Sequence, residues 1–426
     1  MRSEADRFKQ LYDVEQHVMA IDGGVLVEDP YPALAELRAQ APVHKGSVRD
    51  LLGLGPGGLN LRPEAPVYSA LSFEANDIAL RENDVFSSTF YEGVATQLFG
   101  RSILEMVGDE HRRYRALVQP TFSPKRSQWW IDRWIASLVD DAVSAFEARG
   151  HAELNAELCS RIPLQTITSS FGLTRDEALD FREGAGEAMV LHPEERAARQ
   201  ERSTAMLRRV IEERRAHPQD DVITQLVESE ISEDGTRHLL TNDEIYGFAR
   251  LILTAGSGTT WRQLGILLVA LLREPALLGA LRDDRALLPR VIDEAVRWEP
   301  TDPIFRRLVV EDVELCGTEI PAGSVVEMAL GAANRDPARW DDPDRFDPYR
   351  APKANLGFAG GPHVCLGMHV ARAEMLVAID AVLDRLPNIR FDPEAPAARI
   401  IGLEHRGPNG VPVVFDAATT NAEEPT

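Results

Sequence analysis

Cysteine is scarce in this chain of 426 residues, which contains only Cys159, Cys316 and Cys365. The three lie far apart, and none belongs to a Cys-x-x-Cys pair, so the sequence predicts neither a zinc site nor a disulfide framework. Such sparse cysteine usage is typical of proteins from a reducing compartment. We therefore expect a cytoplasmic protein.

Long apolar runs are also missing. The two most apolar uncharged stretches, residues 251–261 and 263–272, are each about half the length needed to span a bilayer. The first six residues, MRSEAD, are charged and do not resemble a signal peptide. On these grounds we expect no membrane partner.

Basic side chains are outnumbered by acidic ones. The 46 Lys and Arg residues face 68 Asp and Glu residues, which gives a formal net charge of −22. A surface this acidic repels nucleic acid phosphates and anionic membranes, so we expect neither as a partner. Solubility is the simpler explanation of the charge.

Helical patterns dominate, and no repeat, linker or composition break divides the chain. Thr241 and Glu244 form a capping-box pattern, and the apolar residues that follow predict one buried helix of roughly 30 residues, ending near Leu272. The strand-like segments are short and are expected to form one small β region: 307–310, 313–316, 325–328 and 411–415. The fold class is therefore mainly α with a small β region, in a single domain over 1–426 whose residues 417–426 form a flexible tail.

The most informative segment is FAGGPHVCLG, residues 358–367. Consecutive glycines and a proline indicate a tight loop, and the apolar positions after it recur with helical spacing. Cys365 then lies where a loop enters a helix, an environment that favours the thiolate. A small buried cysteine is the alternative on composition alone, and a catalytic nucleophile would lack an obvious base.

This segment resembles the haem-binding signature of the cytochrome P-450 superfamily, F-G-x-G-x-H-x-C-x-G, with Ala359 in place of the first glycine. The resemblance implies that Cys365 ligates the iron of haem b through a thiolate that favours O–O cleavage. It also implies a fold in which a long oxygen-side helix and the cysteine loop sandwich the haem. The loop residues expected at the cofactor are Phe358, Gly360, Gly361, His363 and Gly367.

Further motifs occur in the order expected of this superfamily. Glu294 and Arg297 match its E-x-x-R pair, which supports the haem-side core. His111 and Arg115 share a helix face and match residues that bind haem propionates. Arg307 matches another propionate-binding arginine, and the adjacent Arg306 is an alternative for that role.

Within the long helix, residues 255–260 read AGSGTT and resemble the A-G-x-D/E-T-T motif of the superfamily. Ala255 is expected beside the haem, in a helix that bulges at its glycines. The resemblance implies that Thr259 hydrogen-bonds to bound oxygen, while Gly258 replaces the usual acid. We expect water ordered by Thr259 and Ser257 to deliver protons. Two alternatives to water are open: a carboxylate from elsewhere in the chain, such as Glu404, delivers the protons, or the enzyme uses peroxide in place of O2.

The predicted function is that of a haem-thiolate monooxygenase, which inserts one atom of O2 into a lipophilic small molecule with electrons from a separate ferredoxin and reductase. Arg112, Arg113 and Arg372 are the expected docking patch. A peroxide-dependent peroxygenase is the alternative, and a haem sensor or electron carrier without catalysis is the rival from another class. The expected substrate pocket is mainly apolar and comprises Phe90, Leu251, Ala255, Ile304, Phe305, Leu403 and Glu404.

Overall fold

The computed structural model describes residues 11–55, 57–58, 61–93, 100–186, 193–233 and 236–417. The expected tail lies outside these residues apart from its first residue, Ala417. The described part is mainly helical with small sheets, as the sequence predicted. Its helices include α2 (Val14–Ile21), α3 (Tyr31–Gln40), α4 (Val48–Leu51), α5 (Phe73–Arg81), α7 (Gly108–Val118), α8 (Ser127–Trp130), α9 (Ala136–Ser144), α10 (Arg161–Ser169), α11 (Arg175–Gly186), α12 (Pro193–Ala216), α13 (Val222–Glu228), α14 (Asn242–Arg273), α15 (Pro275–Asp283), α16 (Leu288–Trp298), α17 (Leu330–Ala333) and α18 (Met368–Arg385).

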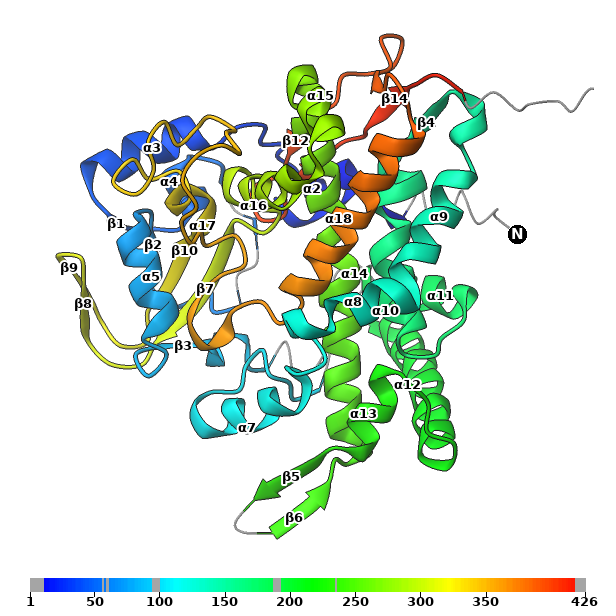
Figure 1. Ribbon diagram of the computed structural model, residues 1–426. Helices are drawn as coiled ribbons and strands as arrows, with labels where there is room; N and C mark the ends of the chain where they lie inside the picture. Colours follow the sequence, from blue (N-terminus) through cyan, green and yellow to red (C-terminus); the bar gives the residue numbers. More distant parts are fainter. Residues whose placement is uncertain are drawn as a thin grey trace, which may run out of the picture.

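Helix α14 has 32 residues and runs through the helical part of the molecule (Figure 1). It begins with the predicted capping box, in which Thr241 and Glu244 each satisfy the other's backbone N–H. Most of its side chains are buried and belong to the largest hydrophobic cluster. This explains why its apolar residues show no single amphipathic stripe.

Helices and sheets occupy different sides of the molecule. Figure 1 shows α9, α10, α14 and α18 close together on one side, while the largest sheet lies on the other beside α3 and α5. That sheet has the order β1 (Val43–Lys45), β2 (Val67–Ala70), β10 (Val325–Ala329), β7 (Ile304–Val309), β3 (Phe86–Ser87). Only the β2–β10 pair is parallel in this sheet, and Val326 lies opposite Arg307 in the antiparallel β7–β10 pair.

The prediction of one β region is wrong for two of the four segments. Residues 411–415 form β14 (Pro412–Val414), which pairs with β4 (His151–Glu153) and β11 (Arg390–Phe391) in a separate sheet. Residues 313–316 form β8 (Val313–Leu315), which makes a hairpin with β9 (Thr318–Ile320). Strand pairing depends on tertiary contacts that the sequence pattern does not specify. The remaining short strands are β5 (Glu230–Glu233), β6 (Thr236–Leu239), β12 (Ile400–Ile401) and β13 (Gly407–Pro408).

Among the described residues, no single helix is long and apolar enough to cross a membrane. Helices α14 and α15 reach that length and composition only as a pair, and the pair is bent by 101°.

Candidate functional site

The cysteine loop is held tightly in front of α18. The backbone N–H of Cys365 donates to the carbonyl of Phe358 at 2.9 Å, and that of Val364 donates to Gly361 at 3.1 Å. Gly361 has a φ of +65°, and a Cβ there would lie 2.0 Å from the carbonyl oxygen of Leu80, so no other residue fits. Ala359, which departs from the signature, also has a positive φ of 57°. An alanine in this conformation costs about 1 kcal/mol.

Cys365 is exposed as a residue, although protein atoms crowd around its thiol group. Desolvation raises the pKa of this thiol, while the backbone of Gly367 and the charge of Arg115 act in the opposite direction. The backbone N–H at Gly367 therefore acts in the direction expected at the start of a helix, while desolvation of the thiol has the larger effect. A coordinated metal ion would deprotonate such a thiol outright.

Cationic and imidazole groups gather beside the loop. The Nη2 of Arg115, from α7, donates to the carbonyl of Val364 at 2.6 Å. The rings of His111 and His363 are stacked with their centroids 4.0 Å apart. Burial and the charges of Arg115 and Arg307 lower the pKa of His111 to about 4. Both histidines are consequently neutral at pH 7, since the pKa of His363 falls to about 2, mainly through burial.

This cluster has donors but lacks negative charge. The Nε2 of His111 and the Nε of Arg307 are buried without a hydrogen-bond partner. Neither Arg115 nor Arg307 forms an ion pair with any residue that the structure describes. Buried cations are usually paired, so two guanidinium groups and an imidazole N–H without carboxylates suit a ligand that carries carboxylates of its own. The propionates of haem have this chemistry.

Arg306 is placed differently from its neighbour Arg307. Its guanidinium pairs with Glu327 at 2.8 Å and with Glu404 at 2.5 Å, and all three side chains are buried. Arg306 is therefore not the alternative propionate-binding arginine, because Glu327 and Glu404 already match its charge. The same ion pair removes Glu404 as a free carboxylate for proton delivery or substrate binding.

Glu294 and Arg297 form the expected pair on α16. Their side chains lie 2.7 Å apart and are almost fully buried. Arg297 also donates to the carbonyls of Asn334, Pro343 and Arg345. The pair therefore fixes α16 to the segment that precedes the cysteine loop.

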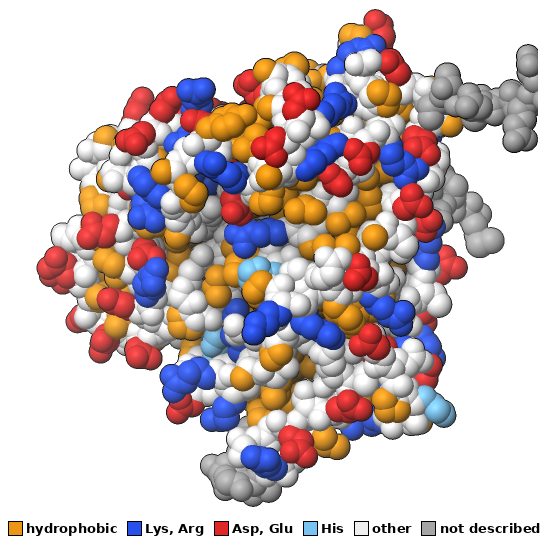
Figure 2. All heavy atoms as spheres, viewed as in Figure 1, with side chains coloured by type: hydrophobic (Ala, Val, Ile, Leu, Met, Phe, Trp, Pro, Cys, Tyr) orange, Lys and Arg blue, Asp and Glu red, His pale blue; other side chains and the backbone are white. Residues whose placement is uncertain are grey.

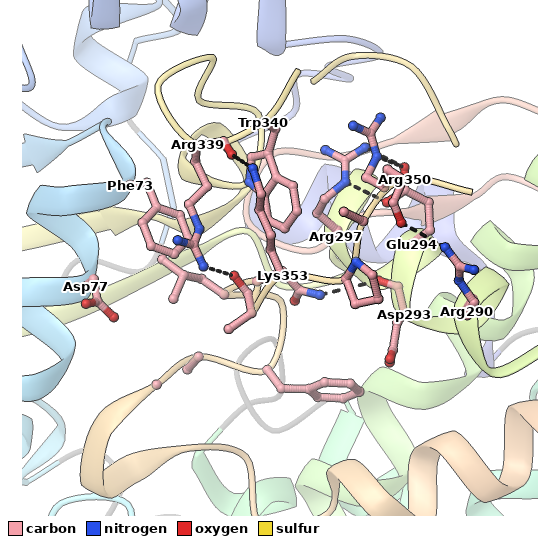
Figure 3. A pocket seen from close by; sticks show the side chains of 18 of the residues that line it. Phe73, Asp77, Arg290, Asp293, Glu294, Arg297, Arg339, Trp340, Arg350 and Lys353 are labelled. Atoms are coloured by element: carbon pink, nitrogen blue, oxygen red, sulfur yellow. Dashed lines mark hydrogen bonds and ion pairs between the residues drawn. The ribbon is translucent and has the colours of Figure 1, made fainter. Parts of the chain in front are cut away.

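A cavity of about 510 Å³ lies between this pair and the cysteine loop (Figure 3). Figure 3 shows Arg297 and Arg350 beside Glu294, with Trp340, Arg339 and Lys353 along the wall. No residue of α14 lines the cavity, nor does any residue of the expected substrate pocket. This cavity is therefore separate from the residues expected to bind substrate.

The centre of α14 presents different groups on different sides. Ala255 is exposed, and the half-buried Thr259 donates from Oγ1 to the Ala255 carbonyl at 3.0 Å. Ser257 is buried and donates to the carbonyl of Leu253 at 2.6 Å. Ser257 thus does not share the face of Thr259, and the role proposed for it in ordering water there is not supported.

The expected bulge in this helix is also absent from the described backbone, which remains α-helical from 255 to 260. Gly256 has a packing role instead, because a Cβ there would lie 2.8 Å from Cγ1 of Ile167. Arg182 lies beside Gly258, and its Nη1 is 3.7 Å from the position that a Cβ on Gly258 would occupy. Sequence reasoning missed Arg182, because nothing near it in the chain connects it with Gly258.

The residues expected to bind substrate are only partly brought together. Ile304 and Leu403 are buried in one hydrophobic cluster, whereas Phe305 packs against a second cluster and Leu251 against the largest one. Phe90 is buried against the ring of Tyr91, with centroids 5.0 Å apart.

The fold and the cysteine loop define a haem-containing oxidoreductase. The family model "Cytochrome P450" matches residues 190–391. Cytochrome P450 monooxygenase PikC from Streptomyces venezuelae is 33% identical over 375 residues, which cover 85% of each chain. The chain belongs to the cytochrome P450 family, which implies a haem-thiolate cofactor, and it is a cytochrome P450 monooxygenase that acts on small molecules.

Solved structures agree with this assignment. Crystalline P450BioI in complex with an acyl carrier protein that carries hexadec-9Z-enoic acid gives a TM-score of 0.78 and 26% identity, covering 91% of this chain and 99% of the other. CYP109E1 from Bacillus megaterium in complex with testosterone gives a TM-score of 0.77 and 25% identity, with the same coverage. The mainly helical P450 fold predicted from the sequence is confirmed.

Proposed function

We propose that this chain holds haem b through the Cys365 thiolate, with His111, Arg115 and Arg307 binding its propionates. The observation that carries the proposal is the cluster formed by half-buried Arg115 with buried Arg307 and His111 beside the cysteine loop, which has no carboxylate partner among the described residues. Phe358, Gly360, Gly361, His363 and Gly367 shape the loop around the cofactor. When bound, thiolate-ligated haem supplies activation of O2 and transfer of one oxygen atom to the substrate.

The proposed substrate is a lipophilic small molecule. Phe90, Leu251, Ile304, Phe305 and Leu403 are apolar and would line its pocket together with Ala255 on α14. The testosterone bound by CYP109E1 and the fatty acyl chain presented to P450BioI are lipophilic ligands of related enzymes, which supports the same class here.

Thr259 is proposed to hold the proton or water needed at the oxygen side of the haem. Its hydroxyl lies one helical turn from the exposed Ala255 and donates to its carbonyl, so it can also accept from a water. Gly258 provides no acid next to it. For this reason peroxide-dependent turnover remains the second candidate function.

The proposed electron donor is a separate ferredoxin with its reductase, acting on a cytoplasmic enzyme. Lys and Arg side chains gather around the start of α18 and over α7 on the face shown in Figure 2. Arg112 and Arg113 are exposed on α7, although Arg112 pairs with Asp109. Arg372 pairs with Asp293 at 2.8 Å and lies 4.8 Å from the ring of Phe358 in the cysteine loop. An acidic ferredoxin would be attracted to this face.

The docking proposal is tested by reversing charge at both exposed positions. Arg112→Glu together with Arg113→Glu should slow reduction by the ferredoxin about tenfold at low ionic strength, because complementary charges mainly raise association rates. Arg202→Glu, on the exposed side of α12, is the matched control. Equal rates in both variants would exclude this patch.

The haem proposal is tested by the carbon monoxide difference spectrum of the reduced protein. A strongly red-shifted Soret band that Cys365→Ala abolishes is the expected result. Folded, haem-supplied protein without this band would overturn the proposal. Comparing turnover with peroxide alone against turnover with NADH, ferredoxin and reductase then distinguishes the two candidate functions.

A further inference from the structure

A second group of cationic side chains lies around Gly258, separate from the cluster at the cysteine loop. Arg262 follows one turn later on α14, and its Nη1 donates to the carbonyl of Gly258. Arg182 reaches the same place from α11, which packs against α14. A Cβ on Gly258 would meet only the Nη1 of Arg182 within 4 Å, at 3.7 Å. Gly258 therefore leaves space that faces a guanidinium group.

Both arginines are almost fully buried, and their guanidinium groups are incompletely hydrogen-bonded. Arg182 is 5% exposed and Arg262 is 6% exposed, and the Nε of each lacks a hydrogen-bond partner. Within the described part of the chain, neither forms an ion pair with a carboxylate. Asp302 is the acid whose charge acts on Arg262, but it already accepts a hydrogen bond from Nδ1 of His405 at 2.7 Å.

Two further titratable groups beside the arginines are uncharged. Burial raises the pKa of Tyr12 to about 12 despite the nearby guanidinium groups, so its phenol is neutral. Burial and the two arginine charges lower the pKa of His17 to about 3, so its imidazole is neutral as well. Burial, together with the charge of Arg182, lowers the pKa of Arg262 to about 10, which leaves it positive at pH 7. Arg262 thus shares the charge of Asp302 with His405, and Arg182 contacts no carboxylate among the described residues.

We propose that Arg182 and Arg262 form a binding site for a carboxylate, which lies in the space beside Gly258. An unpaired buried cation is costly, and the planar guanidinium group binds carboxylates through parallel N–H donors. The carboxylate comes either from a small free acid or from a lipophilic acid in the substrate pocket. The second source rests on the proposed function.

Such a carboxylate would adjoin Thr259 in space where the A-G-x-D/E-T-T motif carries its acid. An oxygen atom of the bound carboxylate would hold a proton at a position where the chain itself has no acidic side chain. The site is thus a place where a bound molecule supplies the group that Gly258 lacks.

Binding of radiolabelled acetate to the haem-loaded enzyme, measured by equilibrium dialysis at fixed ionic strength, tests the proposal. One equivalent is expected to bind, with chloride as a weak competitor. Gly258→Asp places a carboxylate in the same space and should weaken acetate binding at least about tenfold, as should Arg182→Gln. Arg202→Gln removes an exposed arginine from α12 and should leave binding unchanged.

Absence of saturable binding, or equal binding by wild type and Gly258→Asp, would overturn the proposal. Gly258→Asp is informative even if Arg182→Gln fails to fold, because its Cβ fits without a clash. Dodecanoate distinguishes the two sources of the carboxylate. If dodecanoate competes with acetate and also shifts the haem spin state, the ligand is a lipophilic acid in the substrate pocket. If only short acids bind, the ligand is a small free acid. The carbon monoxide spectrum, recorded on each sample, reports separately on the haem proposal.

Discussion

The imidazole rings of His111 and His363 stack at a centroid distance of 4.0 Å with 26° between their planes, which joins α7 to the cysteine loop. Stacking at this distance is compatible with two neutral rings, and burial keeps the pKa of both well below its usual value. His363 also shares a hydrogen bond with Oγ of Ser88 at 3.0 Å. His111 has no such partner at Nε2, so its donor is available to a ligand.

Removing this donor should weaken haem retention. His111→Phe keeps an aromatic ring in the stack but removes Nε2, and haem loss to an acceptor such as apomyoglobin should accelerate about tenfold, since a hydrogen bond to a charged group is typically worth about 1.5–3 kcal/mol. His151→Phe, at an exposed position on β4, is the control. An unchanged rate of haem loss would show that His111 does not contact the propionates.

Two ion pairs that involve the neighbouring α16 residues Asp293 and Glu294 should differ greatly in their contribution to stability. Glu294–Arg297 is buried, whereas Asp293–Arg372 is partly exposed. Arg297→Gln leaves the buried Glu294 with Arg350 as its remaining cationic partner and should lower the free energy of unfolding by about 3 kcal/mol. Arg372→Gln should cost about 0–1 kcal/mol. Urea unfolding of both variants measures the difference, and similar losses would contradict the structural role of the buried pair.

Glu374 on α18 predicts a pH dependence of stability. It is 2% exposed, its Oε1 has no hydrogen-bond partner, and burial raises its pKa from 4.5 to about 8. Between these values the unfolded chain binds fewer protons at this group than the folded protein does. Stability should therefore fall as pH rises from about 5 to 8, by about 1 kcal/mol per pH unit.

Glu374→Gln removes this titration without adding charge. The variant should be more stable than wild type at pH 8 by on the order of a few kcal/mol, with a difference that vanishes only below pH 4.5, the usual pKa of a glutamic acid. Urea unfolding across this range measures both proteins, and Asp384→Asn, exposed on the same helix, is the control. A pH-independent difference between wild type and Glu374→Gln would show that the carboxyl is not protonated in the folded state.

Features that depend on local signals could be predicted from the sequence. The start of α14 follows from Thr241 and Glu244, and the cysteine loop follows from its glycines and the helical pattern after it. Features that depend on distant contacts could not. The pairing of Arg306 with Glu404 joins residues 98 positions apart, and the approach of Arg182 to Gly258 joins two helices. No spacing rule connects such residues before the chain folds.

Thr259→Ala should uncouple electron consumption from product formation. The Thr259 hydroxyl lies on the same side of the AGSGTT segment as the exposed Ala255 and donates to its carbonyl. The hydroxyl of Ser257 is buried and donates to the carbonyl of Leu253, so it does not share this side. Without the Thr259 hydroxyl, product formed per NADH consumed should fall by roughly tenfold or more, since positioned proton transfer contributes at least that much, while the carbon monoxide spectrum stays unchanged. Thr259→Ser keeps the hydroxyl and should retain most of the coupling. Equal coupling in wild type and Thr259→Ala would assign proton delivery to another group. If added acetate restored the coupling of Thr259→Ala, that group would be the carboxylate bound at Arg182.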